Sequence, residues 1–193
     1  MHQDRTHAVQ GSAKSNPCHR RFRCGSIENP LLGVFLCQAG CGFVTIHASY
    51  AGVWDMHADV NNADMITGMN YMGVPFDHAV SAFLEDIRDR GLEDKVLLVC
   101  CGEMGRTPRI NKKGGRDHWG NIAPLLLSGG GLEMGQVVGQ STRNVGEPLT
   151  TPYRINNLVG TIFNTLFDIG ELRLNQGVPR DIASAMETYQ PIS

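Results

Sequence analysis

The sequence lacks any apolar run that approaches the ~20 residues of a membrane-spanning helix. It also lacks a strong excess of charge of one sign, since 17 Lys and Arg stand against 19 Asp and Glu in 193 residues. We therefore expect neither a membrane nor a nucleic acid as a partner. Six cysteines are present without CxxC pairs in a chain of this length, which excludes a small disulfide scaffold. A hydrophobic content of 41% excludes a fully disordered chain.

The length suits one globular domain with a core of its own. Residues 1–30 carry several basic side chains and almost no periodic apolar content, so we predict a disordered basic arm over 1–30 and a folded domain over 31–193. The pair Arg20-Arg21 is also typical of a twin-arginine export leader. Glu28, Asn29 and Pro30 interrupt the apolar stretch that such a leader needs, so no clear leader is predicted and the localisation stays open.

From residue 42 onward, predicted strands and helices alternate along the chain. Short β-rich or apolar runs predict strands at 43–47, 96–101 and 122–127. Apolar residues at helical spacing predict helices that end near Gly91 and Gly170. This alternation favours an α/β fold with a parallel or mixed sheet covered by helices.

Three polar clusters lie next to the predicted strands, and ligands of open α/β sheets bind at strand ends. The clusters are Trp54–His57, Gly102–Arg109 and Gly114–Trp119. Each alone has an ordinary structural explanation, such as a capped turn or a surface ion pair. Together they supply the carboxylate and imidazole groups of a divalent metal site, from Asp55, His57, Glu103, Asp117 and His118.

The ordered motifs resemble one known family. Trp-Asp-x-His (54–57), Gly-Glu-x-Gly-Arg-Thr-Pro (102–108), Gly-Arg-Asp-His-Trp (115–119) and a Gly-Gly-Gly after a Leu-rich run match the sulfatase-like proteins called domain of unknown function 1501, which are related to the alkaline phosphatase superfamily. The resemblance covers about residues 30–185. Such an ordered series of motifs is more specific than any single one.

This resemblance implies a three-layer α/β/α sandwich of the alkaline phosphatase and sulfatase type. It implies divalent metals at strand ends that help to hydrolyse a small phosphate or sulfate ester. By position, the metal ligands would be Asp55, His57, Glu103 and His118, with Asp117 as a ligand or as the group that orients one. Arg106 and Arg116 would face the anionic substrate.

The sequence departs from the family in its N-terminal part. Family members are longer, and the half that carries the nucleophile in catalytic relatives has no recognisable counterpart here. The resemblance therefore implies a partial sandwich without its N-terminal half, made of the C-terminal portion that supplies metal ligands. We expect weak or no activity from this fragment alone, with its catalytic residue unassigned, and self-association through an exposed sheet edge.

A rival hypothesis comes from another functional class. Five cations, Arg106, Arg109, Lys112, Lys113 and Arg116, lie within eleven residues and would suit a non-catalytic module that binds anions or another protein. Such a module would lose affinity with salt and ignore chelators, whereas a metal enzyme would do the reverse. The sequence leaves open zinc, manganese or calcium as the metal, and phosphate or sulfate as the ester.

Overall fold

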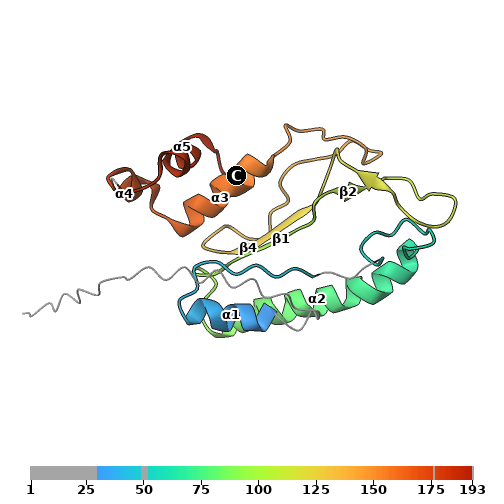
Figure 1. Ribbon diagram of the computed structural model, residues 1–193, viewed down its shortest axis with the longest axis horizontal. Helices are drawn as coiled ribbons and strands as arrows, with labels where there is room; N and C mark the ends of the chain where they lie inside the picture. Colours follow the sequence, from blue (N-terminus) through green and yellow to red (C-terminus); the bar gives the residue numbers. More distant parts are fainter. Residues whose placement is uncertain (1–29, 49–51, 176, 193) are drawn as a thin grey trace, which may run out of the picture.

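The computed structural model describes residues 30–48, 52–175 and 177–192 (Figure 1). The basic arm predicted over residues 1–30 therefore lies almost wholly outside the described residues. In chain order the elements are α1 (Pro30–Gln38), α2 (Met65–Asp89), β1 (Leu97–Cys101), β2 (Gly105–Arg106), β3 (His118–Trp119), β4 (Leu125–Gly129), α3 (Ile155–Leu166), α4 (Ile169–Arg173) and α5 (Arg180–Thr188).

The described strands form two small antiparallel sheets. β1 pairs with β4, so that Leu97 lies opposite Gly129, and β2 pairs with β3. The fold is thus mixed α/β, as predicted, but the prediction of a parallel or mixed sheet is wrong for these strands. The hairpin β2–β3 lies between β1 and β4 in the chain and turns it back, which makes the β1–β4 pair antiparallel. Residues 43–47, predicted as a strand, have β pairing at a single bridge residue, Ile46, and form no continuous strand.

Helix α2 is longer than the predicted one because it begins well before the apolar stripe. The Asp64 side chain accepts hydrogen bonds from the backbone N–H groups of Ile66 and Thr67, which caps the first turn. The helix continues through Pro75 and ends at the Arg90 cap, followed by Gly91 with φ +63°. This early start brings the first turn of α2 next to the loop that precedes it.

The main hydrophobic cluster joins α1, α2 and β1. Val34, Phe83 and Ile87 are buried together, and four partly buried apolar side chains pack against them: Leu84, Leu92, Val96 and Leu98. Helices α1 and α2 therefore lie along one side of the β1–β4 sheet (Figure 1). This packing buries the apolar residues of the C-terminal part of α2, whereas several large apolar side chains nearer its start are exposed: Ile66, Met69, Tyr71, Val74 and Phe76.

Helices α3 to α5 form the other side of the molecule (Figure 1). Thr165 of α3 lies against Gly130 at the end of β4, where a Cβ on Gly130 would come within 2.5 Å of the Thr165 methyl carbon. In α3, Gly160 allows the backbone of Tyr189 to approach closely after α5. Among the described helices, none combines the length and the apolar character that crossing a bilayer requires.

Replacing a buried isoleucine of α2 by alanine should destabilise the protein more than replacing an exposed isoleucine of the same helix. Ile87 is 2% exposed, whereas Ile66 on the same helix is 73% exposed. We expect Ile87→Ala to lower the free energy of unfolding by about 2–5 kcal/mol through lost burial and cavity formation. Ile66→Ala should change it by less than about 0.5 kcal/mol. Chemical denaturation of both variants measures this, and equal effects would contradict the packing described here.

Candidate metal centre

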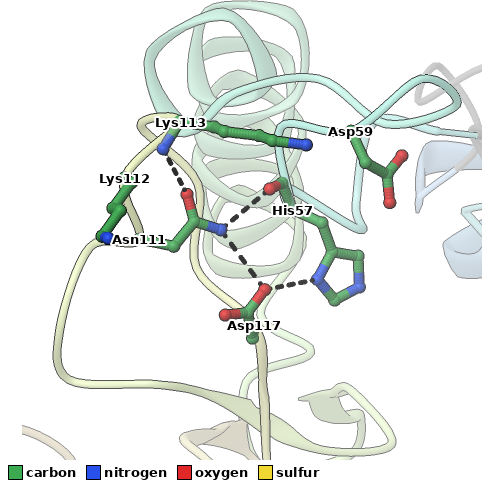
Figure 2. Close-up of a pocket in the computed structure, with 6 residues that line it drawn as sticks. All are labelled: His57, Asp59, Asn111, Lys112, Lys113 and Asp117. Carbon is green, nitrogen blue, oxygen red and sulfur yellow. Dashed lines mark hydrogen bonds and ion pairs between the residues drawn. The ribbon is translucent and has the colours of Figure 1, made fainter.

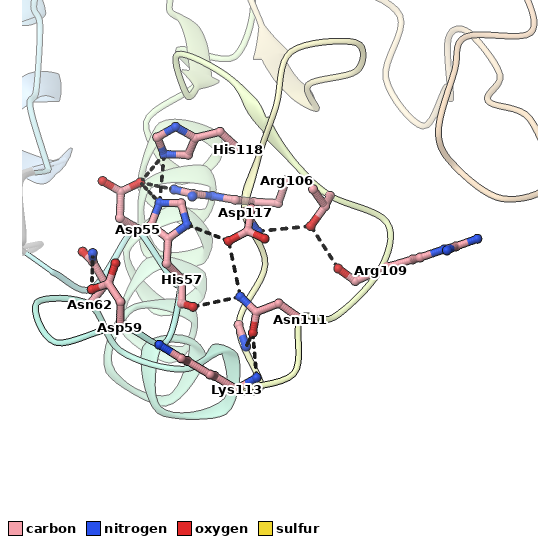
Figure 3. Close-up of polar contacts among 12 residues, drawn as sticks. Asp55, His57, Asp59, Asn62, Arg106, Arg109, Asn111, Lys113, Asp117 and His118 are labelled. Carbon is pink, nitrogen blue, oxygen red and sulfur yellow. Dashed lines mark hydrogen bonds and ion pairs between the residues drawn. The ribbon is translucent and has the colours of Figure 1, made fainter.

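The segment 54–57 is anchored on α2 through every second side chain. Trp54 meets Phe76 edge-on, with ring centroids 6.4 Å apart. Met56 is buried against Gly68, where a Cβ would come within 2.6 Å of the Met56 side chain. The other two residues of the segment, Asp55 and His57, point instead toward His118 (Figure 3).

The hairpin β2–β3 joins two of the predicted motifs. Arg106 on β2 lies directly opposite His118 on β3. The pairing continues beyond the strands, since the Thr107 N–H donates to the Asp117 carbonyl oxygen at 2.9 Å and the Asp117 N–H donates to Thr107 Oγ1 at 3.1 Å. The hairpin register thus places an arginine, a carboxylate and an imidazole at one end of the molecule.

Backbone contacts dock the hairpin loop onto the segment 54–57. The Arg116 N–H donates to the Met56 carbonyl oxygen at 2.7 Å, and Asn111 Nδ2 donates to the His57 carbonyl oxygen at 2.9 Å. A Cβ at Gly115 would lie 2.3 Å from the His57 carbonyl carbon. Only glycine therefore permits this approach, which brings residues 60 positions apart into one cluster.

Three donor atoms from these two segments converge in a candidate metal group (Figure 3). Asp55 Oδ1, His57 Nε2 and His118 Nε2 lie within 4.8 Å of one another. The two ring nitrogens are 3.1 Å apart, and Asp55 Oδ1 is 2.9 Å from His118 Nε2 and 3.8 Å from His57 Nε2. The side chains of Asp55 and His118 are nearly half exposed, so one side of the group faces solvent.

Asp117 contacts the group from behind rather than joining it. Asp117 Oδ1 lies 3.2 Å from His57 Nδ1, on the ring edge away from the other two donors. An ionised carboxylate accepts hydrogen bonds only, so this contact places the His57 ring proton on Nδ1. The lone pair of Nε2 then points at Asp55 and His118, which is the tautomer that a metal ligand needs.

Arg106 neutralises the carboxylate of the group. Its Nη2 donates to Asp55 Oδ1 and, at 2.9 Å, to the Trp54 carbonyl oxygen. The hydrogen bonds from Arg106 and then from His118 lower the pKa of Asp55 from 3.8 to about 2. Asp55 is therefore ionised over the ordinary pH range and available as a ligand.

Two other predicted site residues take different positions. Glu103 is exposed and is not part of the donor group found among the described residues. The Arg116 side chain donates from Nε to the Thr107 carbonyl oxygen at 2.6 Å and from Nη2 to the Pro108 carbonyl oxygen at 3.4 Å. The Arg116 guanidinium thus braces the hairpin loop in this structure, and the substrate role predicted for it remains a prediction.

Of the five basic residues that would form an anion-binding module, two bond within the protein and three lie at its surface. Arg106 and Arg116 make the internal bonds given above, whereas the Arg109 side chain points away from the cluster (Figure 3). Lys112 and Lys113 line a shallow pocket of about 430 Å³ (Figure 2). Its other lining residues are His57, Asp59, Asn111 and Asp117, so the pocket carries charges of both signs.

Sequence reasoning missed Asn111 and Thr107, which hold the predicted residues in place. Asn111 Oδ1 accepts hydrogen bonds from the N–H groups of Lys113 and Gly115, both at 3.0 Å. An asparagine shortly before a glycine pair is a signal for such a side-chain turn. That signal predicts the turn but not the second contact of Asn111 with Asp117.

Comparison with known proteins places these motifs in a family. A family model described as "Protein of unknown function (DUF1501)" matches residues 2–177. The chain belongs to the DUF1501 family. No curated protein and no solved structure matches it. Every residue of the candidate metal group and its surroundings falls inside the match, which confirms the DUF1501 family. The match begins at residue 2, whereas the motifs had indicated a resemblance from about residue 30.

The close approach at Gly115 can be tested without changing a polar side chain. Gly115→Ala would place a methyl group against the His57 backbone, and we expect it to lower the free energy of unfolding by about 1–3 kcal/mol. Gly120→Ala is the matched control, because nothing lies within 4 Å of a Cβ there. Thermal denaturation of the two variants measures the difference. Equal stability of both would show that the hairpin loop does not dock on this segment.

The ion pair of Arg106 makes a prediction about pH. We expect Arg106→Gln to raise the pKa of Asp55 from about 2 toward 3.8. Because the folded-state pKa is lowered, ionised Asp55 stabilises the fold above about pH 3.8, and this contribution disappears as the pH falls through about 2. Carboxyl ¹³C NMR titration measures the midpoint, with Arg109→Gln as a control. An unchanged Asp55 midpoint in Arg106→Gln would contradict the pairing.

Proposed function

We propose that this DUF1501 protein is related to the metal-dependent phosphate and sulfate ester hydrolases, with Asp55, His57 and His118 as metal ligands. The observation that carries the proposal is the convergence of these three donor atoms within 4.8 Å on a solvent-facing side. Three protein ligands with one open side is the arrangement of catalytic rather than structural zinc sites. The open side would admit water or an ester oxygen.

The separations of the three donors fit a small divalent ion. Ligand atoms around a tetrahedral zinc at about 2.0–2.2 Å stand roughly 3.3–3.6 Å apart. The three separations here are 2.9, 3.1 and 3.8 Å, which bracket that range. Asp55 is ionised, and the Nδ1 proton of His57 leaves its Nε2 free to bind. His118 Nε2 donates to Asp55 in this structure, so it would have to give up that proton when a metal binds.

The chemistry of the donors narrows the choice of metal. Two imidazole nitrogens with one carboxylate suit zinc or manganese, whereas calcium takes oxygen ligands almost exclusively. Of the three metals that the sequence left open, this donor set favours zinc or manganese. The bound ion would polarise an ester oxygen and lower the pKa of a water molecule.

The remaining residues have defined tasks in this proposal. Asp117 holds the His57 ring in the tautomer that exposes Nε2. Arg106 orients Asp55 and places a positive charge beside the open side, where it would offset charge that develops on an anionic ester. Glu103 and Arg116 enter the proposal only as the family resemblance implies them, as a further ligand and a substrate contact. A nucleophile is not assigned.

The family resemblance supports two further parts of the proposal. The helices on both sides of the β1–β4 sheet are consistent with part of an α/β/α sandwich of the sulfatase and alkaline phosphatase type. In that arrangement the chain supplies metal ligands, and a nucleophile would come from elsewhere. We expect the chain alone to hydrolyse phosphate or sulfate esters weakly or not at all.

Metal content tests the proposal directly. We expect the purified protein to bind near-stoichiometric zinc or manganese by mass spectrometry, and the double variant His57→Ala/His118→Ala to lose it. The matched control His47→Ala/His78→Ala removes two exposed histidines outside the cluster and should retain the metal. Equal, sub-stoichiometric metal in all three proteins would contradict the metal site.

The same proteins separate the proposal from an anion-binding module. A metal site should lose its ion to a chelator and change little with salt, whereas binding of a polyanion such as heparin by the surface lysines should weaken steeply with salt. Salt-sensitive heparin binding without metal would favour the module. Hydrolysis of aryl phosphate and aryl sulfate esters by the metal-loaded protein would then distinguish the two ester classes.

A further inference from the structure

We propose that Asn111 is a positioning residue that sets the orientation of His57 through Asp117. It comes from the middle of the β2–β3 loop and lies outside the donor group of Asp55, His57 and His118. The inference rests on the proposed metal function for its consequence, which is tighter metal binding. The effect of Asn111 on the orientation and protonation of the His57 ring involves only residues of this chain and does not depend on a bound metal.

The Asn111 amide uses both ends of its side chain at once (Figure 2). Its Nδ2 donates to the His57 carbonyl oxygen at 2.9 Å and contacts Asp117 Oδ1 at 3.3 Å. Its Oδ1 accepts the N–H groups of Lys113 and Gly115. One side chain therefore ties the loop turn, the backbone of the first ligand segment and the carboxylate behind His57 to one another.

The contact at Asp117 decides how that carboxylate faces His57. The oxygen that receives the Asn111 amide, Asp117 Oδ1, is the same atom that lies 3.2 Å from His57 Nδ1. Two donors thus converge on one oxygen, while the Asp117 N–H is held separately by Thr107 Oγ1. With both its backbone and its oxygen fixed, Asp117 has one orientation, and the proton of the His57 ring is directed to Nδ1.

These contacts fix the position of the His57 ring as well as the location of its proton. Asn111 holds the His57 carbonyl oxygen while Asp117 holds the ring nitrogen, so the backbone and the side chain of His57 are tied to the same loop. Ligands supported in this way lose metal affinity by about 10–100-fold when the supporting partner is removed. We expect an effect of this size at Asn111.

Two substitutions at Asn111 separate its donor role from its turn role. Asn111→Asp keeps an oxygen that can accept the N–H groups of Lys113 and Gly115, so the turn is retained. It removes the Nδ2 donor and sets a second carboxylate against Asp117 Oδ1. Asn111→Ala removes both roles and shows how much the turn contributes to stability. Asp117→Asn, alone and with Asn111→Asp, tests whether the effect passes through Asp117.

The test reads the His57 ring in the metal-free protein by ¹⁵N NMR and then zinc affinity by titration. In the wild type we expect the Nδ1–H tautomer of His57. In Asn111→Asp we expect a folded protein, a mixed or Nε2–H tautomer, and zinc affinity reduced by about tenfold or more. The double variant should bind zinc no worse than Asp117→Asn alone.

The outcomes distinguish this inference from the proposed function. A wild-type tautomer and wild-type zinc affinity in Asn111→Asp would overturn the positioning role, and so would losses that add in the double variant. If the wild-type protein binds no metal, the proposed function fails, but the tautomer of His57 in the metal-free variants still decides the role of Asn111.

Discussion

The backbone contact between Met56–His57 and Gly115–Arg116 is the constraint on which the candidate site depends. It joins two segments that are far apart in the chain, through the Arg116-to-Met56 hydrogen bond and an approach that only glycine allows. Of the buried apolar side chains described, only Met56 belongs to either segment, and it packs on α2. The two segments are therefore held to each other by directional polar contacts, whose geometry is set by the backbone.

The sequence predicted those elements whose own residues determine them. The apolar periodicity of α2 and α3 marked both helices, and the apolar run at 96–101 matches β1 to within one residue, although its side chains are half-buried or exposed rather than fully buried as predicted. The third predicted strand, 122–127, is displaced by about three residues, because Pro124 cannot donate to the ladder and pairing with β1 begins only after it. The direction of the sheet was mistaken, since it depends on a hairpin between the strands that local patterns do not reveal.

The candidate site likewise contains residues that the motifs predicted and residues whose positions depend on tertiary contacts. Motif residues of suitable chemistry predicted Asp55, His57 and His118 together, and the structure brings these three into one group. The position of Glu103 outside it, and the supporting role of Asn111, depend on how a loop folds over a distant segment. Such tertiary contacts have no periodic signal in the sequence, so only the Asn-to-glycine turn was open to prediction.

The positive charge of Arg106 offsets the negative charge of Asp55 in the metal-free protein. Its guanidinium and the neighbouring ring already satisfy Asp55, and Asp117 is satisfied by His57 and Asn111. The donor atoms are thus preorganised by hydrogen bonds within the protein, in contrast to small metal domains that fold only around their ion. A metal that binds this group would exchange one set of partners at Asp55 for another, and it would add to the stability of an already folded chain by mass action rather than create the fold.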